Sequence, residues 1–281
     1  MRNDIELINP NIPRGKVRCA VFDFDGTLSL LREGWPQAMR AVMLDALMAT
    51  PARESAEELD RFVTDLIYQT SGQQTIYQMI RLTEEVVKRG GAPDAPQAYK
   101  ELFAKRVLAR VSERVAAIRA GKNSIEEWCV PGTVPLLESL RARGVICYIA
   151  SGTDEVFVRN EAALLGLATY FADIFGAHAD YKNHSKKVVI GNLVARHALR
   201  AGELVTFGDG APEIVDTKAV GGIAIGVASD EAKRDGINPR KRETLLQAGA
   251  DIIVPDYRAH ATLLGYLFVT KESHASRGVG S

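Results

Sequence analysis

Residues 20–29 read AVFDFDGTLS, an apolar run that ends in two aspartates separated by one residue. A glycine and a threonine follow directly, so the chain turns where Asp23 and Asp25 come together. Two carboxylates this close raise each other's pKa unless a positive charge lies between them. A structural role rarely needs that arrangement, whereas a metal site or a nucleophile beside an acid often does. The stretch therefore predicts a buried strand with a chemical site at its end.

Similar apolar runs recur along the chain, and each is followed by a turn and a helical pattern. We expect parallel strands at 17–24, 144–151, 203–209, 221–227 and 251–256, with a shorter one at 172–177. Strands that alternate with helices are typical of an α/β fold with a doubly wound parallel sheet. Ligands of such sheets bind outside the carboxyl ends of the strands.

The segment from Trp35 to Ala120 shows helical stripes and no convincing strand. For example, residues 57–68 place their apolar side chains on one helical face, behind a capping box formed by Ser55 and Glu58. A chain of 281 residues exceeds one ordinary domain. We expect an α/β core formed by 1–30 and 129–270, an inserted α-helical domain at 31–128 and a disordered tail at 271–281.

The charge balance and the cysteines limit the partners and the compartment. Lys plus Arg and Asp plus Glu number 35 each, so the formal net charge is zero and nucleic acid is not expected as a partner. The basic cluster NPRKR at 238–242 is interpreted as a solvated loop. Neither a signal peptide nor a membrane span is predicted, and Cys19, Cys129 and Cys147 lack metal-ligand spacing. A cytoplasmic protein with reduced cysteines in its core is therefore expected, without a membrane partner.

Polar residues suited to one task follow the predicted strands or begin a helix between them: Asp23, Asp25, Thr27, Ser151, Gly152, Lys186, Lys187, Asp209 and Glu213. Asp23 can attack phosphorus, while Asp25 can protonate the leaving oxygen and later accept a proton from water. Asp23, the backbone carbonyl of Asp25 and Asp209 offer hard oxygen ligands for Mg²⁺. Ser151, the backbone amides from Gly152 on, a lysine and Thr27 are expected to hold the phosphate oxygens.

This set of residues resembles the haloacid dehalogenase-like superfamily of phosphohydrolases, and the phosphoglycolate phosphatases within it. Asp23, Asp25, Gly26 and Thr27 match the family's DxDGT motif, and Ser151 matches its second motif. Lys186 or Lys187 matches the third motif, and Asp209 matches the fourth. The resemblance covers roughly residues 17–30 and 130–268. It also identifies the helical insert as similar to the family's cap, which closes over the active site.

Some assignments within the resemblance stay open. Lys186 is preferred to Lys187, since Ile190 then falls one helical turn farther on, as in the family's lysine-headed helix. The family usually has an aspartate where Glu213 stands, so Glu213 is expected to hold the metal through water, and Asp216 is a weaker substitute. In or near the insert, Arg32, Glu33 and Gln73 are candidates for substrate contact. Trp35 is interpreted either as a buried residue at a hinge or as a further substrate contact. Near the lysine, His178 and His184 are interpreted as surface or packing histidines.

The resemblance implies a Mg²⁺-dependent phosphatase that hydrolyses a small phosphomonoester, with a sugar phosphate or similar metabolite as the leading class, through an aspartyl-phosphate intermediate. Asp25 argues against the family's dehalogenases and phosphonate-cleaving enzymes, which usually lack that aspartate. A phosphomutase of the same superfamily and a catalytically idle binding or scaffold protein are the alternatives. The oligomeric state stays open, and residues 5–15 form either an edge strand or an oligomer contact.

Overall fold

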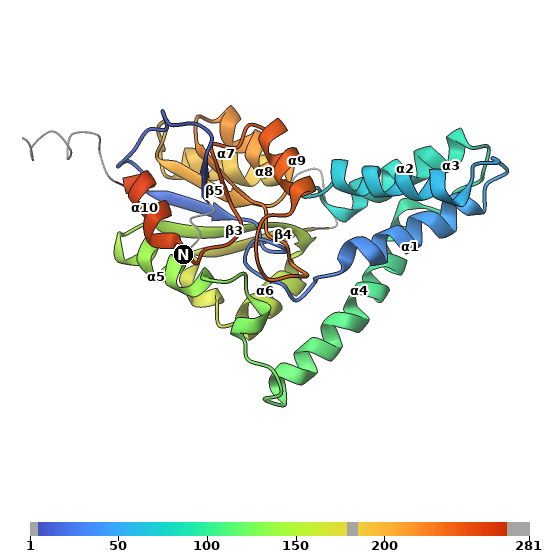
Figure 1. Ribbon diagram of the computed structural model, residues 1–281, viewed down its shortest axis with the longest axis horizontal. Coiled ribbons are helices and arrows are strands. Elements are labelled where there is room, and N and C mark those ends of the chain that lie inside the picture. The colour runs from blue at the N-terminus through green and yellow to red at the C-terminus, as the bar shows by residue number, and fades with distance from the viewer. Residues whose placement is uncertain (1–4, 179–184, 269–281) are drawn as a thin grey trace, which may run out of the picture.

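The computed structural model describes residues 5–178 and 185–268. It contains a seven-stranded sheet with helices on both faces, and a group of helices beside one edge of this layered unit (Figure 1). The strand order is β1-β7-β6-β5-β2-β3-β4. The strands are β1 (Glu6–Leu7), β2 (Cys19–Phe22), β3 (Ile146–Asp154), β4 (Asp173–Ala177), β5 (Leu204–Gly208), β6 (Ile223–Val227) and β7 (Ile252–Val254). The doubly wound α/β fold is thus confirmed.

The central strand β2 forms where the sequence is apolar on both faces. All four of its residues are buried, and it pairs in parallel with both β3 and β5. Its alternate residues face different layers: Ala20 and Phe22 belong to one hydrophobic cluster, and Cys19 and Val21 to another. Such strands read as continuous apolar runs, which is why all six expected strands appear close to their expected positions.

Part of the segment 5–15, expected to form either an edge strand or an oligomer contact, forms a strand in the structure. Glu6–Leu7 form β1, which pairs antiparallel with β7 and makes an edge strand. The backbone amides of Ile8 and Asn9 continue the contact by donating to the carbonyl oxygen of Asp251 at 3.0 and 2.9 Å. The expected strand at 144–151 differs at its end, because β3 runs on through an irregular register to Asp154.

Within the described part of the chain, the helices that cover the sheet are α5 (Thr133–Ala142), α6 (Glu155–Leu164), α7 (Lys186–Arg196), α8 (Ala211–Ala219), α9 (Pro239–Gln247) and α10 (His260–Phe268). Short 3₁₀ turns lie at Glu126–Trp128 and Ala168–Tyr170. Helices α5, α6 and α10 pack on the face that carries Phe22, while α7 packs on the opposite face. Helices α8 and α9 share a further cluster with β6 and β7. The layers therefore leave the carboxyl ends of the parallel strands free to carry a site.

The helical unit consists of α1 (Trp35–Met48), α2 (Ala56–Gln69), α3 (Thr75–Lys88) and α4 (Pro96–Arg119), which enclose a hydrophobic cluster of their own. The capping box is present, since the Ser55 amide donates to Glu58 Oε2 at 2.8 Å and the Glu58 amide donates to Ser55 Oγ at 3.2 Å. Ile118, near the end of α4, packs against the sheet's core instead. Helix α4 thus connects the two apolar clusters.

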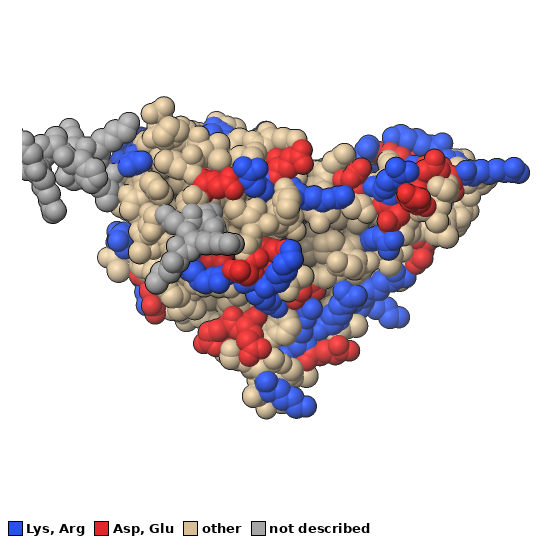
Figure 2. All heavy atoms as spheres, viewed as in Figure 1, with Lys and Arg blue, Asp and Glu red and all other residues tan. Residues whose placement is uncertain are grey.

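The three cysteines are free and buried, as expected, and burial raises the pKa of each thiol to about 12. Within the described ranges, no helix combines the length and apolarity needed to span a bilayer. Lysines and arginines lie interspersed with acidic side chains on the face shown in Figure 2, in keeping with the zero net charge. The expected disordered tail at 271–281 lies outside the described residues.

Candidate active site

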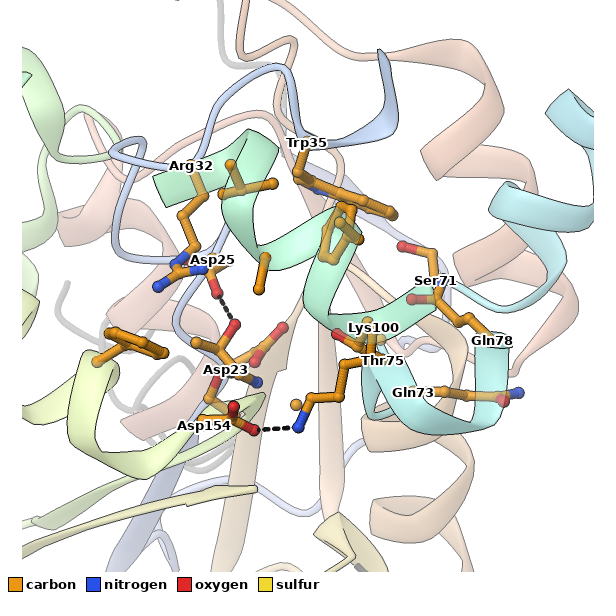
Figure 3. Close-up of a pocket in the computed structure, with 18 of the residues that line it drawn as sticks. Asp23, Asp25, Arg32, Trp35, Ser71, Gln73, Thr75, Gln78, Lys100 and Asp154 are labelled. Atoms are coloured by element: carbon orange, nitrogen blue, oxygen red, sulfur yellow. Dashed lines mark hydrogen bonds and ion pairs between the residues drawn. The ribbon is translucent and has the colours of Figure 1, made fainter. Parts of the chain in front are cut away.

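Three neighbouring parallel strands bring their polar ends together. Phe22 of β2 aligns with Ile149 of β3 and with Phe207 of β5, so the residues after these positions meet at one edge of the sheet. Six of the residues expected to serve in catalysis, phosphate binding or metal binding line one cavity at this edge: Asp23, Asp25, Ser151, Gly152, Lys186 and Asp209. Figure 3 shows Asp23 and Asp25 in this cavity together with side chains contributed by the helical unit, among them Trp35 and Lys100.

The turn after β2 depends on Gly26. Its φ is +75°, a conformation that residues with a side chain rarely adopt. A Cβ atom at this position would also lie 2.3 Å from Asp209 Oδ2. Glycine therefore lets the chain turn sharply while Asp209 approaches the backbone beside Asp25.

Lys186 lies at the centre of the site. It begins α7, which Ser185 caps by accepting a hydrogen bond from the Val188 amide at 3.3 Å. Lys186 Nζ lies 3.0 Å from Asp23 Oδ1 and 3.0 Å from Glu213 Oε2. Burial alone would lower the pKa of Lys186, but these two carboxylates raise it above its usual value. Lys187 is exposed and does not line the cavity.

A cluster of three buried carboxylates is suited to a metal ion. Oxygen atoms of Asp23, Asp209 and Glu213 lie within 4.8 Å of one another. Burial, together with the negative neighbours, raises the pKa values of Asp23 and Glu213, although Lys186 opposes the shift in both. A cation would relieve this repulsion, and Mg²⁺ prefers oxygen ligands of this kind. Asp216 is half-buried, and its oxygen atoms do not belong to this cluster.

Lys241 of α9 reaches the same cluster, a contact that the sequence did not predict. Its Nζ lies 2.7 Å from Asp209 Oδ2 and 2.6 Å from Glu231 Oε1. Attraction by these two carboxylates raises the pKa of Lys241 in spite of its burial. The interpretation of residues 238–242 as a solvated loop is therefore wrong, because this segment begins α9 and turns one lysine inward.

Asp25 is held by a hydroxyl and faces a guanidinium. Thr153 Oγ1 donates to Asp25 Oδ2 at 2.7 Å, and Arg32 Nε lies 3.6 Å from Asp25 Oδ1. Arg32 is fixed in turn by Glu161 of α6, to which its two nitrogens donate at 3.2 and 2.6 Å. Burial raises the pKa of Asp25, and Arg32 opposes that shift. Asp25 is thus a partly buried carboxyl group with an increased tendency to hold a proton.

Other candidates from the sequence lie elsewhere. Thr27, expected to bind phosphate, is fully buried and does not line the cavity. Glu33 lines a neighbouring cavity and accepts a hydrogen bond from Arg234 Nη2 at 3.0 Å. His178 is exposed and lies 3.0 Å from Glu155. His184 falls outside the described residues.

The loop between α2 and α3 lies against the strand ends. Gln73, expected as a substrate contact, lines the cavity there together with Arg32 and Trp35. A Cβ atom on Gly152 would lie only 2.9 Å from the Gln73 carbonyl oxygen, so the two backbones are in close contact. Lys100 Nζ of α4 bonds to Asp154 Oδ1 of β3 at 2.7 Å across the same space. The helical unit therefore covers the cavity at the strand ends.

Known proteins resemble this chain in sequence or in fold. A 5'-nucleotidase from Pseudomonas aeruginosa is 25% identical over 224 residues, which are 80% of this chain and 85% of that protein. A predicted phosphoglycolate phosphatase from Haemophilus somnus matches 89% of this chain and 99% of its own, with a TM-score of 0.60 and 16% identity. A β-phosphoglucomutase from Clostridium difficile matches 89% of this chain and 97% of its own, with a TM-score of 0.59 and 13% identity. These solved structures share the fold.

A family model settles the wider relationship. The model for haloacid dehalogenase-like hydrolases matches residues 17–215, which include β2, the helical unit, Asp209 and Glu213. The motifs that suggested this family from the sequence lie within the matched range. The chain belongs to the haloacid dehalogenase-like hydrolases.

Proposed function

We propose that this protein is a Mg²⁺-dependent phosphatase that hydrolyses a small phosphomonoester, with Asp23 as the nucleophile. The observation that carries the proposal is the position of Asp23, buried at a strand end with Lys186 at 3.0 Å and Asp25 two residues away. Membership in a family of hydrolases supports it. The likeness in sequence to a protein named 5'-nucleotidase supports a phosphoric monoester as the substrate.

In the first step, a carboxylate oxygen of Asp23 attacks phosphorus, and the bond between phosphorus and the ester oxygen breaks. Asp25, protonated, gives its proton to the leaving oxygen, so an alcohol departs and Asp23 carries the phosphoryl group. Ser151, the Gly152 amide and Lys186 line the cavity where the phosphate oxygens would lie. These donors stabilise the charge that spreads over the phosphoryl oxygens.

In the second step, water attacks the phosphorus of the aspartyl-phosphate. Asp25, now a carboxylate, takes a proton from this water. The bond between phosphorus and Asp23 breaks, inorganic phosphate leaves, and Asp23 returns as a carboxylate. One residue thus serves first as acid and then as base, a role that its partly buried, hydrogen-bonded position supports.

Asp23, Asp209 and the backbone carbonyl of Asp25 would hold Mg²⁺, with Glu213 in support through a water molecule. The bound ion would neutralise negative charge on the phosphate and on the carboxylates. Lys241 keeps Asp209 in place from the other side, since it bonds to Asp209 Oδ2.

The helical unit would serve as a cap that keeps bulk water and long substrates out of the site. A roofed cavity favours a small metabolite, with sugar phosphates as the leading class from the sequence. Free, buried cysteines fit a reducing compartment such as the cytoplasm. A phosphomutase with the same nucleophile is the second candidate, since the β-phosphoglucomutase shares the fold.

The proposal is tested by phosphate release from p-nitrophenyl phosphate, with Mg²⁺ and after EDTA treatment. We expect release that depends on Mg²⁺ and falls at least about 100-fold in EDTA, because the charge on the phosphate is then no longer neutralised. Readdition of Mg²⁺ should restore the rate. A rate that EDTA leaves unchanged would remove the metal from the mechanism.

Lys186 and Lys187 form a matched pair for a second test. Lys186→Met should lower kcat/KM by about 10²- to 10³-fold, because it removes a buried donor to the phosphate and to Asp23. Lys187→Met should leave kcat/KM within about twofold, because Lys187 is exposed and lies outside the cavity lining. Equal losses in the two variants would mean that the lysines act through the charge of α7 and not through a contact.

A further inference from the structure

Large apolar side chains line part of the cavity. Five side chains form this apolar wall: Trp35 of α1, Phe103, Val107 and Leu108 of α4, and Phe157 of α6. Figure 3 shows Trp35 and Lys100 entering the pocket from the helical unit and Asp154 entering from β3. The leaving group of a bound phosphate ester would lie against this wall, because the phosphate itself must lie beside Asp23.

The cations of the cavity are already paired. Among residues 5–178 and 185–268, Arg32, Lys100 and Lys186 are the cations that line it. Arg32 bonds to Glu161 at 2.6 Å, Lys100 bonds to Asp154 at 2.7 Å, and Lys186 contacts Asp23 and Glu213 at 3.0 Å. Once a phosphate lies against Lys186, the described part of the cavity offers no unpaired cation to a second anionic group.

We propose that the substrate is a phosphomonoester whose leaving alcohol is uncharged and presents an apolar, ring-sized face to this wall. This inference rests on the proposed function and narrows its substrate class. A carboxylate or second phosphate on the leaving group would lose its hydration beside the apolar wall without gaining a cation whose charge no protein carboxylate already balances. An aromatic or hydrocarbon face would instead bury its surface against Trp35 and Phe103.

The polar side of the cavity completes this description. Ser71, Gln73, Thr75 and Gln78 line it from the loop after α2 and the start of α3. These neutral side chains can bond to hydroxyl groups but cannot balance a charge. The leaving alcohol thus tolerates hydroxyls on one side only. Phosphoglycolate and sugar bisphosphates do not fit this description, because each carries a second anionic group. Exclusion of bisphosphates also disfavours a mutase, which needs a bisphosphate activator.

The test compares three esters of primary alcohols with wild-type enzyme and Mg²⁺: benzyl phosphate, glucose 6-phosphate and phosphoglycolate. We expect kcat/KM for benzyl phosphate to exceed that for phosphoglycolate by at least about 100-fold and that for glucose 6-phosphate by about tenfold. Benzyl alcohol and glycolate have similar leaving ability, so the ratio of kcat/KM between benzyl phosphate and phosphoglycolate reports how the cavity accommodates the two leaving groups. A preference for phosphoglycolate would contradict the inferred substrate class but would still show a phosphatase. If the enzyme released phosphate neither from these three esters nor from p-nitrophenyl phosphate, both the inference and the proposed function would be wrong.

Two variants that supply a free cation give an independent test. Leu108→Lys places an amine on the apolar wall, and Asp154→Asn releases the amine of Lys100. Each should raise kcat/KM for phosphoglycolate relative to benzyl phosphate by at least about tenfold. Leu102→Lys is the control, since Leu102 lies on the same helix but is exposed and outside the cavity. Should Leu108→Lys fail to fold, Asp154→Asn still decides, because Asp154 is partly exposed.

If neither folded variant changes the ratio, the inference is wrong. It is equally wrong if Lys100→Met lowers turnover of phosphoglycolate specifically, since Lys100 would then bind a second anionic group of the substrate instead of serving Asp154 alone.

Discussion

Replacing Asp23 by asparagine should lower kcat/KM by at least about 10³-fold with any phosphate ester. The amide group has nearly the shape of the carboxylate but does not form an acyl phosphate at a useful rate. Because the nucleophile, Lys186 and Asp25 act as a unit, removing the nucleophile removes most of what the others contribute. Steady-state phosphate release with Mg²⁺ at saturating and limiting ester concentrations measures the loss.

The same substitution should leave the fold intact. Burial raises the pKa of Asp23, so its charged form is disfavoured in the folded protein. A neutral asparagine avoids this penalty, and Lys186 keeps its contact with Glu213. We therefore expect the free energy of unfolding, measured without metal, to be unchanged or slightly increased. Asp216→Asn, the same change at a half-buried carboxyl outside the cavity lining, should alter neither activity nor stability by much.

A variant Asp23→Asn that keeps a tenth of the wild-type rate would contradict the role of Asp23. A loss of activity accompanied by a large drop in melting temperature would be no support, because an unfolded enzyme is inactive for any reason. Circular dichroism and thermal melts of the same samples separate these outcomes.

The sheet was predictable because its strands are buried on both faces. Residues 19–22 are apolar without interruption, so they could be recognised without knowledge of their neighbours. Once the strands are parallel, the register places Asp23, Ser151 and Asp209 at one edge, and their proximity follows. The edge strand Glu6–Leu7 has only two residues, too few for a periodic pattern, so its pairing with β7 could not be predicted.

The side chains that support the site were harder to find. Lys186 could be distinguished from Lys187 by helical spacing, since Ile190 one turn later is buried. Glu161 and Lys241 carry no local signal, because their partners Arg32 and Asp209 lie far away in the sequence. Lys241 stands in a run of basic residues whose other members point outward, and only the tertiary contact shows that one of them is buried. Such pairs form only when elements far apart in the sequence pack together, so the sequence pattern around each residue does not predict them.

Replacing Asp25 by asparagine should reduce turnover by an amount that depends on the leaving group. Benzyl alcohol needs a proton as it departs, so loss of the acid should lower kcat/KM for benzyl phosphate by about 10²- to 10⁴-fold. Nitrophenolate is a stable anion and leaves without a proton, so the first step with p-nitrophenyl phosphate should slow by less than about tenfold. A rapid burst of nitrophenolate, followed by slow release of phosphate, would show that the second step still lacks its base.

Thr153→Val provides the control for this experiment, since it removes the hydroxyl that donates to Asp25 Oδ2 at 2.7 Å but keeps the carboxyl group. Its losses should be smaller than those of Asp25→Asn and similar for the two esters, because the proton donor is misplaced but still present. Mg²⁺ binding, followed by the shift in melting temperature with added metal, should persist in both variants, because the backbone carbonyl of Asp25 is unchanged. Equal losses of Asp25→Asn on both esters, without a burst, would assign Asp25 a structural role beside Arg32 and not the transfer of a proton.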